Sequence, residues 1–147
     1  MTGRTTGPRP AGTRSYLTFR AGSERLGVPL DRVQGAARPR HLTPLPGAPR
    51  EYAGLALVRG EPVGVLDVAA AFGFAAPPPA SRRPVLLLLE GDSRALLVDR
   101  IEAIDEIAPE RISPPPPGAR RLSGLVPDGE RFLALLDLDA FLSGGRE

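Results

Sequence analysis

An internal repeat constrains the fold of this chain more than any other feature of its sequence. Four short segments of the first half recur in the second half, in the same order and at nearly constant spacing. Each half would be only marginally stable alone, so we expect two similar small β-barrels that pack together, with a groove between them as a natural binding place. The matched segments are Asp31-Arg32-Val33 with Asp99-Arg100-Ile101, Gly54-Leu55 with Gly124-Leu125, Arg59-Gly60-Glu61 with Asp128-Gly129-Glu130, and Leu66-Asp67-Val68 with Leu136-Asp137-Leu138.

Short apolar runs separated by glycine and proline turns predict β-strands. Val85–Leu89 has no polar alternation, which predicts a strand buried on both faces. Pro29 cannot donate to a ladder, so its strand should be at an edge or carry a kink. The predicted strands cover residues 16–20, 26–30, 54–58, 62–66, 85–89, 95–98 and 132–136, with residues 31–35 continuing extended after the second.

Turn and cap residues predict the connections between these strands. Arg59-Gly60-Glu61 predicts a tight hairpin turn. Asp67 is a suitable N-cap for a short helix over residues 68–72 that Gly73 would end, and Asp137 is placed to cap a last helix ending near Gly144. Residues 38–50 and the run Pro114–Pro117 are too rich in proline for helix and predict loops, the second of them extended.

These elements predict one folded region between two tails. Residues 1–14, locally basic with arginines among glycine, threonine and proline, predict a disordered tail, and residues 144–147 a second one. Residues 15–143 form the domain, with subdomains over approximately 15–76 and 84–143 joined by a proline linker at 77–79. Whether the two subdomains exchange strands is left open.

The composition argues against an enzyme or a metal site. The 147 residues include no cysteine and one histidine, His41, which lies in a proline-spaced loop where nothing orients its ring for catalysis. Asp99, Asp105 and Glu106 are expected to be solvated charges, because hard cations need about six or more converging oxygens. We expect no catalytic residue, no metal site and no cofactor.

Charge and hydropathy narrow the possible partners. The net charge is only +2, and the 5% of aromatic residues form no stripe beside a basic face, so nucleic-acid binding has weak support. The first residues lack the apolar core of a signal peptide, and the longest apolar run, Val85–Leu89, is far shorter than the ~20 residues that span a bilayer. We therefore expect a soluble, cytoplasmic protein that does not insert into membranes.

The order and spacing of several degenerate motifs across residues 15–143 resemble the CheW family. The resemblance implies an all-β fold of two pseudo-symmetric, intertwined SH3-like barrels of five strands each, with short helices. It implies a non-catalytic adaptor that binds the regulatory domain of a CheA-type histidine kinase and the cytoplasmic tip of a chemoreceptor. The segments that carry it are Tyr16-Leu17-Thr18-Phe19, Val28-Pro29-Leu30-Asp31-Arg32-Val33, Leu45-Pro46-Gly47-Ala48-Pro49, Gly54-Leu55-Ala56-Leu57-Val58-Arg59-Gly60-Glu61, Val65-Leu66-Asp67-Val68, Leu97-Val98-Asp99-Arg100-Ile101 and Leu135-Leu136-Asp137-Leu138.

The resemblance also implies candidate receptor-binding residues: Val33, Gly54 and Arg59, with an apolar groove near Leu30 and Val98 for the helical tip. It does not identify the kinase-binding residues. Each of the first three has a structural alternative. Arg59 would pair with an acid or cap carbonyls inside the fold, Gly54 would supply a positive φ, and Val33 would be plain core.

The chain departs from the family pattern at two positions near these candidates. Leu57 stands where the family often has asparagine, two residues before the arginine, and Gly35 stands where an acidic residue is common. One of the two partner contacts could therefore be altered or lost, and an adaptor that binds the receptor but not the kinase is a close alternative. A nucleic-acid-binding β-barrel and an enzyme are the alternatives from other classes.

Overall fold

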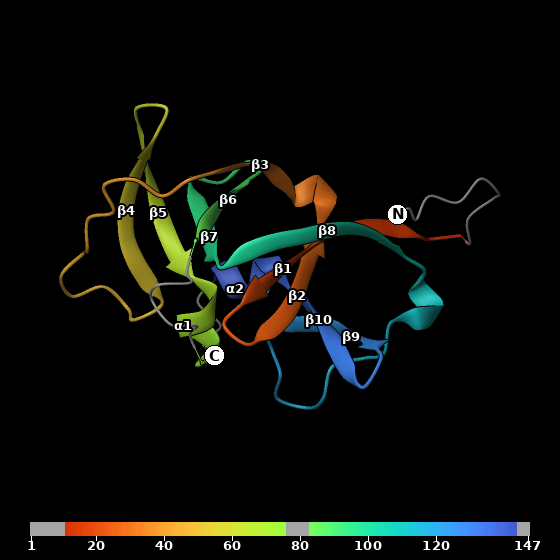
Figure 1. The fold of residues 1–147 in the computed structure, drawn as a ribbon. Helices are drawn as coiled ribbons and strands as arrows, with labels where there is room; N and C mark the ends of the chain where they lie inside the picture. Colours follow the sequence, from red (N-terminus) through yellow and green to blue (C-terminus); the bar gives the residue numbers. More distant parts are fainter. Residues whose placement is uncertain (1–10, 76–82, 144–147) are drawn as a thin grey trace. The chain divides into compact units, whose positions relative to one another are not determined.

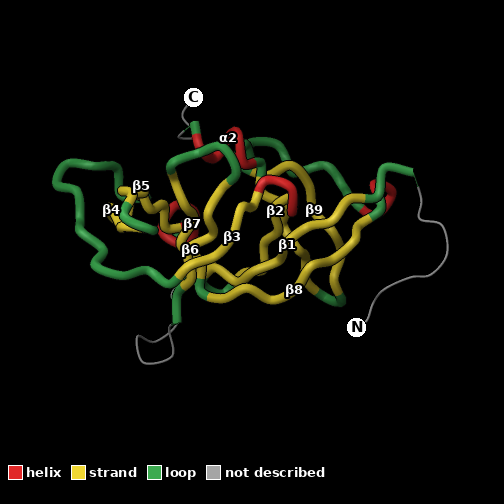
Figure 2. Tube along the Cα trace, turned by 90° about the horizontal axis from the view of Figure 1, so that it is seen from above, coloured by secondary structure: helices red, strands yellow, loops and turns green. Residues whose placement is uncertain are grey.

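A computed structural model describes residues 11–75 and 83–143 and has the predicted all-β fold (Figures 1 and 2). Most of the expected N-terminal tail, the proline linker and the last four residues lie outside the described residues. The strands are β1 (Arg14–Ala21), β2 (Glu24–Pro29), β3 (Val33–Ala37), β4 (Tyr52–Val58), β5 (Glu61–Asp67), β6 (Val85–Leu89), β7 (Arg94–Val98), β8 (Arg100–Ile107), β9 (Leu122–Asp128) and β10 (Arg131–Leu136). The helices are α1 (Val68–Phe72) and α2 (Leu138–Leu142), with 3-10 turns η1 (Leu30–Arg32) and η3 (Pro109–Arg111).

The strands form two five-stranded sheets of the same topology. One has the order β8-β1-β2-β10-β9 and the other β3-β6-β7-β5-β4. When each strand of the first half is matched to its counterpart in the second, the two orders are identical. Each sheet takes two strands from the other half of the sequence: β1 and β2 join β8 to β10, and β6 and β7 join β3 to β5. One join in each sheet is a parallel pair, with Leu26 opposite Ala134 and Gly64 opposite Arg94, whereas β6 joins β3 in an antiparallel pair.

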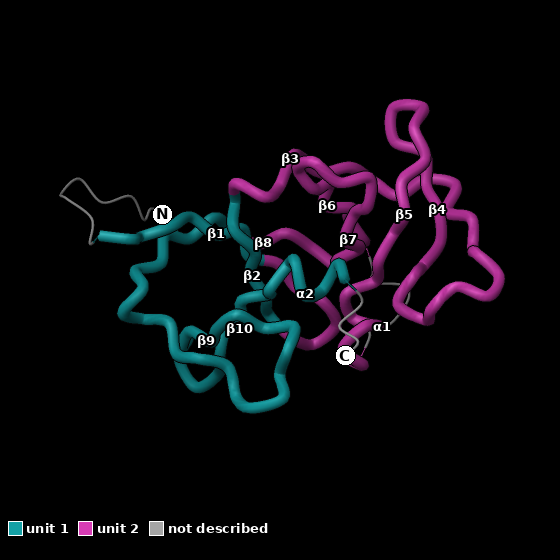
Figure 3. Tube along the Cα trace, turned by 180° about the vertical axis from the view of Figure 1, so that it is seen from behind, with its two compact units in different colours: residues 1–18, 25–30, 103–147 teal, residues 19–24, 31–102 magenta. Residues whose placement is uncertain are grey.

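The chain divides into two compact units that are not the two consecutive halves of the sequence (Figure 3). Unit 1 comprises residues 1–18, 25–30 and 103–147, and unit 2 comprises residues 19–24 and 31–102. Each unit has its own apolar cluster. Strands from both halves of the sequence contribute side chains to each cluster. The cluster of unit 1 includes Tyr16, Ile107, Val126, Leu133 and Leu135, and that of unit 2 includes Ala56, Val65, Leu86, Leu88, Ala95 and Leu97.

The repeat is visible in individual hydrogen bonds. Thr43 and Leu55 exchange two backbone bonds of 2.8 Å in unit 2, and their counterparts in the repeat, Ser113 and Leu125, exchange bonds of 2.8 and 2.9 Å in unit 1. In both units a loop segment therefore crosses onto the outer side of an edge strand, β4 or β9. The structure confirms the repeat predicted from the sequence.

The two α-helices begin as predicted. The carboxylates of Asp67 and Asp137 accept hydrogen bonds from the backbone N–H groups of Ala70 and Ala140 at 3.2 and 3.1 Å, so both aspartates are N-caps. The first helix covers residues 68–72 and ends at Gly73, whose φ of 73° places it in the left-handed region that favours glycine.

The structure differs from the sequence-based predictions after Pro29 and at two strands. Pro29 ends β2, a central strand, and the chain kinks there into η1, so the predicted kink is confirmed but residues 30–32 are not extended as expected. The strands β8 and β9 were not predicted. Charged and apolar residues alternate over only the first four positions of β8, and three of the seven residues of β9 are glycine, proline or aspartate.

Candidate protein-binding site

The β4–β5 hairpin presents Arg59 in an unusual backbone conformation. Val58 pairs with Glu61, which leaves a two-residue loop of Arg59 and Gly60 with φ angles of 52° and 81°. Positive φ at both loop residues defines a type I′ turn, whose first position favours asparagine, aspartate or glycine. An arginine at this position adopts the left-handed backbone conformation, which residues with a long side chain disfavour.

The equivalent hairpin of the other sheet is built differently. Asp128 pairs with Arg131, which leaves Gly129 and Glu130 as the loop. Of these two, only Gly129 has a positive φ, at 66°. The alignment of the repeats matched the two loop glycines with each other, but the pairing registers place Gly60 second and Gly129 first. Arg59 therefore occupies the position that its counterpart loop gives to glycine.

The Arg59 side chain is exposed at the tip of this hairpin, which projects beyond the neighbouring strands of its own sheet (Figure 1). Its guanidinium makes no ion pair or hydrogen bond with any residue that the structure describes. The alternative that Arg59 braces the fold by pairing with an acid or capping carbonyls thus has no support within residues 11–75 and 83–143. The side chain is available to a partner.

Four exposed leucines lie on the same unit as Arg59. Leu57 is 61% exposed, and Leu55 points to the same side of β4 two residues earlier. Because Thr43 pairs with Leu55, the exposed Leu42 and Leu45 flank the outer edge of this strand. We call these residues the hairpin surface: Leu42, Leu45, Leu55, Leu57 and Arg59. The family departure at position 57 thus adds apolar area to an exposed face.

Gly54 has a structural requirement. It lies in β4 with φ of 143°, and a Cβ atom added to it would lie 2.2 Å from the carbonyl oxygen of Thr43. Gly124 occupies the same place in β9, where a Cβ would lie 2.4 Å from Ile112. Gly54 is buried and is not itself a contact surface. It shapes the hairpin surface because the lack of a side chain allows the loop at Thr43 to cross β4.

The other three expected site residues differ in burial. Val33 begins β3 opposite Leu89 and is half-buried, and Leu30 is half-buried in η1. Val98 is only 2% exposed and packs in β7 opposite Val85, so it does not line a surface as expected. Leu30 belongs to unit 1, whereas Val33 and Val98 belong to unit 2.

Three further exposed apolar side chains were missed by the sequence analysis. Ile101 and Ile104 lie on the edge strand β8, with Ile104 57% exposed, and Phe132 on β10 is 55% exposed. The sequence alone does not show that β8 is an edge strand, and without that knowledge its exposed apolar residues cannot be distinguished from residues of the hydrophobic core. An exposed phenylalanine beginning a strand gives no sequence signal either.

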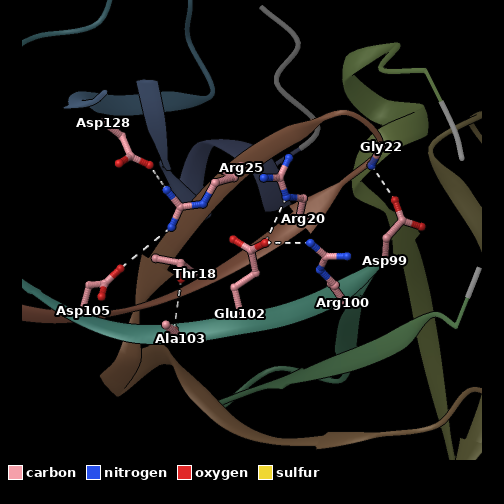
Figure 4. A network of polar contacts seen from close by, with 10 residues as sticks. All are labelled: Thr18, Arg20, Gly22, Arg25, Asp99, Arg100, Glu102, Ala103, Asp105 and Asp128. Carbon is pink, nitrogen blue, oxygen red and sulfur yellow. Dashed lines mark hydrogen bonds and ion pairs between the residues drawn. The ribbon is translucent and has the colours of Figure 1, made fainter. Parts of the chain in front are cut away.

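The acidic residues considered as cation ligands have local partners in their own units (Figure 4). In unit 2, Asp99 accepts a hydrogen bond of 2.5 Å from the backbone of Gly22, and Glu102 pairs with Arg20 at 2.9 Å and Arg100 at 3.2 Å. Within the described ranges no group of three potential metal ligands occurs.

In unit 1, Arg25 bridges two carboxylates, pairing with Asp128 and, at 3.9 Å, with Asp105 (Figure 4). Nearby, the hydroxyl of Thr18 donates to the carbonyl of Ala103 at 3.2 Å. These contacts join β1 and β2 to strands far away in the sequence, and so they assemble the sheet.

The ion pair between Asp92 and Arg94 shifts the pKa values of both groups. Arg94 donates to Asp92 through Nε and Nη2 at 2.9 and 3.0 Å, which holds the pKa of the Asp92 carboxyl below its ordinary value. The same hydrogen bond raises the pKa of Arg94. The pair closes the turn between β6 and β7 and is separate from the hairpin surface in sequence.

Exposed apolar side chains and a projecting arginine on two similar β-sheets are features that protein-docking surfaces share. In the described part of the chain, no helix is long and apolar enough to cross a membrane. The chain belongs to the CheW family, since the model of the CheW-like domain matches residues 15–145. Like other members, it is a non-catalytic scaffold of chemotaxis-type signalling.

Individual relatives agree with this assignment. The chain is 29% identical over 144 residues to the chemotaxis protein CheW of Rhizobium meliloti, covering 92% of each chain. It is 29% identical over 141 residues to the protein FrzA of Myxococcus xanthus, covering 91% of this chain and 88% of that protein. The crystal structure of the scaffolding protein TtCheW from Thermoanaerobacter tengcongensis has the same fold, with a TM-score of 0.72 at 20% identity over 84% of this chain and 88% of that one.

Proposed function

We propose that this protein couples a chemoreceptor to a CheA-type histidine kinase in the cytoplasm, by binding the receptor's cytoplasmic tip and the kinase's regulatory domain at the same time. The observation that carries the proposal is the match to the CheW-like domain over nearly the whole chain. The family membership does not favour nucleic-acid binding.

The hairpin surface suits a helical receptor tip. Docking of an amphipathic helix needs an apolar surface with few polar anchors, and the exposed leucines provide the first, while Arg59, which has no polar partner among the described residues, provides the second. Arginine is enriched at interface hot spots because its planar head makes several directional hydrogen bonds. Arg59 is thus the direct receptor contact on unit 2, where Val33 contributes its exposed part and Gly54 acts through the loop that it admits.

A coupling protein needs a second docking surface for the kinase. Ile104 on β8 and Phe132 on β10 are the most exposed large hydrophobic side chains of unit 1 within its described residues. Replacing either by aspartate removes apolar contact area without leaving a cavity, because both side chains are more than half exposed. Such variants are therefore suited to assigning surfaces to partners.

The first experiment is isothermal titration of the protein with the regulatory domain of its own organism's CheA-type kinase, followed by titration with the receptor tip. Saturable binding of both supports coupling. Binding of the receptor tip alone supports the receptor-only alternative, and binding of neither by a folded sample overturns the proposal. Leu57→Asp, Ile104→Asp and Phe132→Asp, each titrated with both ligands, then assign the surfaces.

A further inference from the structure

The loop between η3 and β9 contains the run Pro114–Pro117, which coupling leaves unexplained. Proline confines its own φ to a narrow range, and it also disfavours the helical region for the residue before it. Ser113, Pro114, Pro115 and Pro116 all precede a proline. The segment is therefore confined by local sterics to the extended, left-handed polyproline II conformation.

The run presents a regular ridge to solvent. A polyproline II helix has three residues per turn, so Pro114 and Pro117 lie on one side of it, about 9 Å apart. Both are exposed, as is Pro116, whereas Pro115 is half-buried. The outward side of the run thus has the P-x-x-P spacing that aromatic-lined grooves recognise.

Both ends of the run are held in place. Ser113 exchanges its two backbone hydrogen bonds with Leu125 in β9, and the N–H of Ala119 donates to the carbonyl of Pro116 at 3.1 Å in a turn that contains Gly118 at φ 87°. Among the described residues, the carbonyls of Pro114 and Pro115 accept no hydrogen bond. The segment therefore offers free acceptors on a backbone that loses little conformational entropy on binding.

The equivalent loop of unit 2 indicates that the fold does not need this many prolines. Thr43-Pro44-Leu45-Pro46-Gly47-Ala48 makes the same bridge to the edge strand and the same turn, with Ala48 donating to Leu45 at 3.2 Å. It does so with two separated prolines. The continuous run in unit 1 exceeds the structural requirement that its own counterpart sets.

We infer that Pro114–Pro117 is a binding site for a protein domain that reads polyproline II helices through an aromatic-lined groove. Arg111, exposed three residues before Pro114, completes an R-x-x-P-x-x-P sequence. Its Nη2 donates to the carbonyl of Pro127 at 3.3 Å, which leaves further N–H groups for a carboxylate at one end of the partner's groove. This binding is independent of receptor and kinase coupling.

The test is titration of a panel of purified SH3, WW and EVH1 domains with the full chain, followed through the tryptophan fluorescence of each domain, since this chain has no tryptophan. We expect one class to bind saturably at one-to-one stoichiometry. The double variant Pro114→Ala with Pro117→Ala should weaken that binding at least about tenfold, and Arg111→Ala should weaken it less.

Two matched controls separate recognition from folding. Pro115→Ala changes the inward side of the same run, and Pro44→Ala with Pro46→Ala changes the counterpart loop. Both should keep wild-type affinity for the reader domain, and all variants should keep the wild-type far-UV circular dichroism spectrum. Absence of binding across the panel overturns the inference, as does equal weakening by Pro115→Ala. A double variant that loses kinase or receptor binding in place of reader binding would assign the run to coupling and also overturn it.

Discussion

Replacing Arg59 by asparagine should make the protein more stable and a weaker receptor ligand at once. A residue with a side chain loses about 1–2 kcal/mol in the left-handed conformation, which Arg59 adopts at φ 52°. Asparagine tolerates this region and is preferred in type I′ turns. Since the Arg59 side chain makes no polar contact with the described residues, nothing offsets the gain, which we expect to be about 0.5–1 kcal/mol in the free energy of unfolding.

That gain corresponds to a rise in Tm of about 1–4 °C for a chain of this size. Loss of an interface arginine commonly costs about 2 kcal/mol, which is a ~30-fold increase in the Kd for the receptor tip. Differential scanning calorimetry and titration calorimetry measure the two effects. Arg50→Ala is the matched control, because this exposed arginine lies two residues before the start of β4, away from the hairpin turn at its other end, and should change neither value.

The combination of outcomes discriminates between the two roles considered for Arg59. A lower Tm for Arg59→Asn would refute the reasoning and indicate that the arginine braces the hairpin. A higher Tm with unchanged receptor affinity would confirm the strained turn and remove Arg59 from the docking surface.

Three further predictions test other parts of the structure. Gly54→Ala should destabilise by about 3 kcal/mol or more, since it combines a positive φ with a backbone clash, whereas Gly35→Ala, which meets nothing within 4 Å, should be nearly neutral in chemical denaturation. Asp67→Ala should cost about 1 kcal/mol through loss of the N-cap bond, measured in the same way. Arg94 lowers the pKa of Asp92, so the stabilisation by this pair is present above the unfolded-state pKa of about 4 and is lost as the pH falls through the lower folded-state value. Asp92→Asn should remove that part of the acid dependence of stability, about 1 kcal/mol or less for such a surface pair. Unfolding titrations between pH 6 and 2 measure it.

The sequence predicted the features that are decided locally. The hairpin around Arg59, the caps at Asp67 and Asp137 and the end of α1 at Gly73 all depend on residues within one turn of each other. The repeat was visible because the N-cap aspartate recurs as Asp67 and Asp137 and a glycine-containing hairpin turn precedes each of these caps, although the two turns differ in register.

The features that sequence could not supply depend on long-range pairing. Half of the residues of β8 are charged, and it is a strand because β1 lies beside it and Arg20 and Arg25 pair with its acids. The left-handed conformation of Arg59 follows from the pairing register of β4 and β5, and the presence of Gly60 in the loop does not by itself determine that register. Burial of Val98 likewise required knowing which strand its side chain faces.

The exchange of strands between the two halves has a consequence for synthesis of the protein. The sheet with β3 at its edge can be completed once β7 has left the ribosome, but β1 and β2 wait for β10, where Leu26 meets Ala134 from near the other end of the chain. At about 5–20 residues per second, the roughly 100 residues between them take roughly 5–20 seconds to make. During this time the first hairpin made, with the apolar side chains of Phe19 and Leu26, has no completed sheet to cover it. The first-made strands are therefore the part of the nascent chain most in need of protection from aggregation.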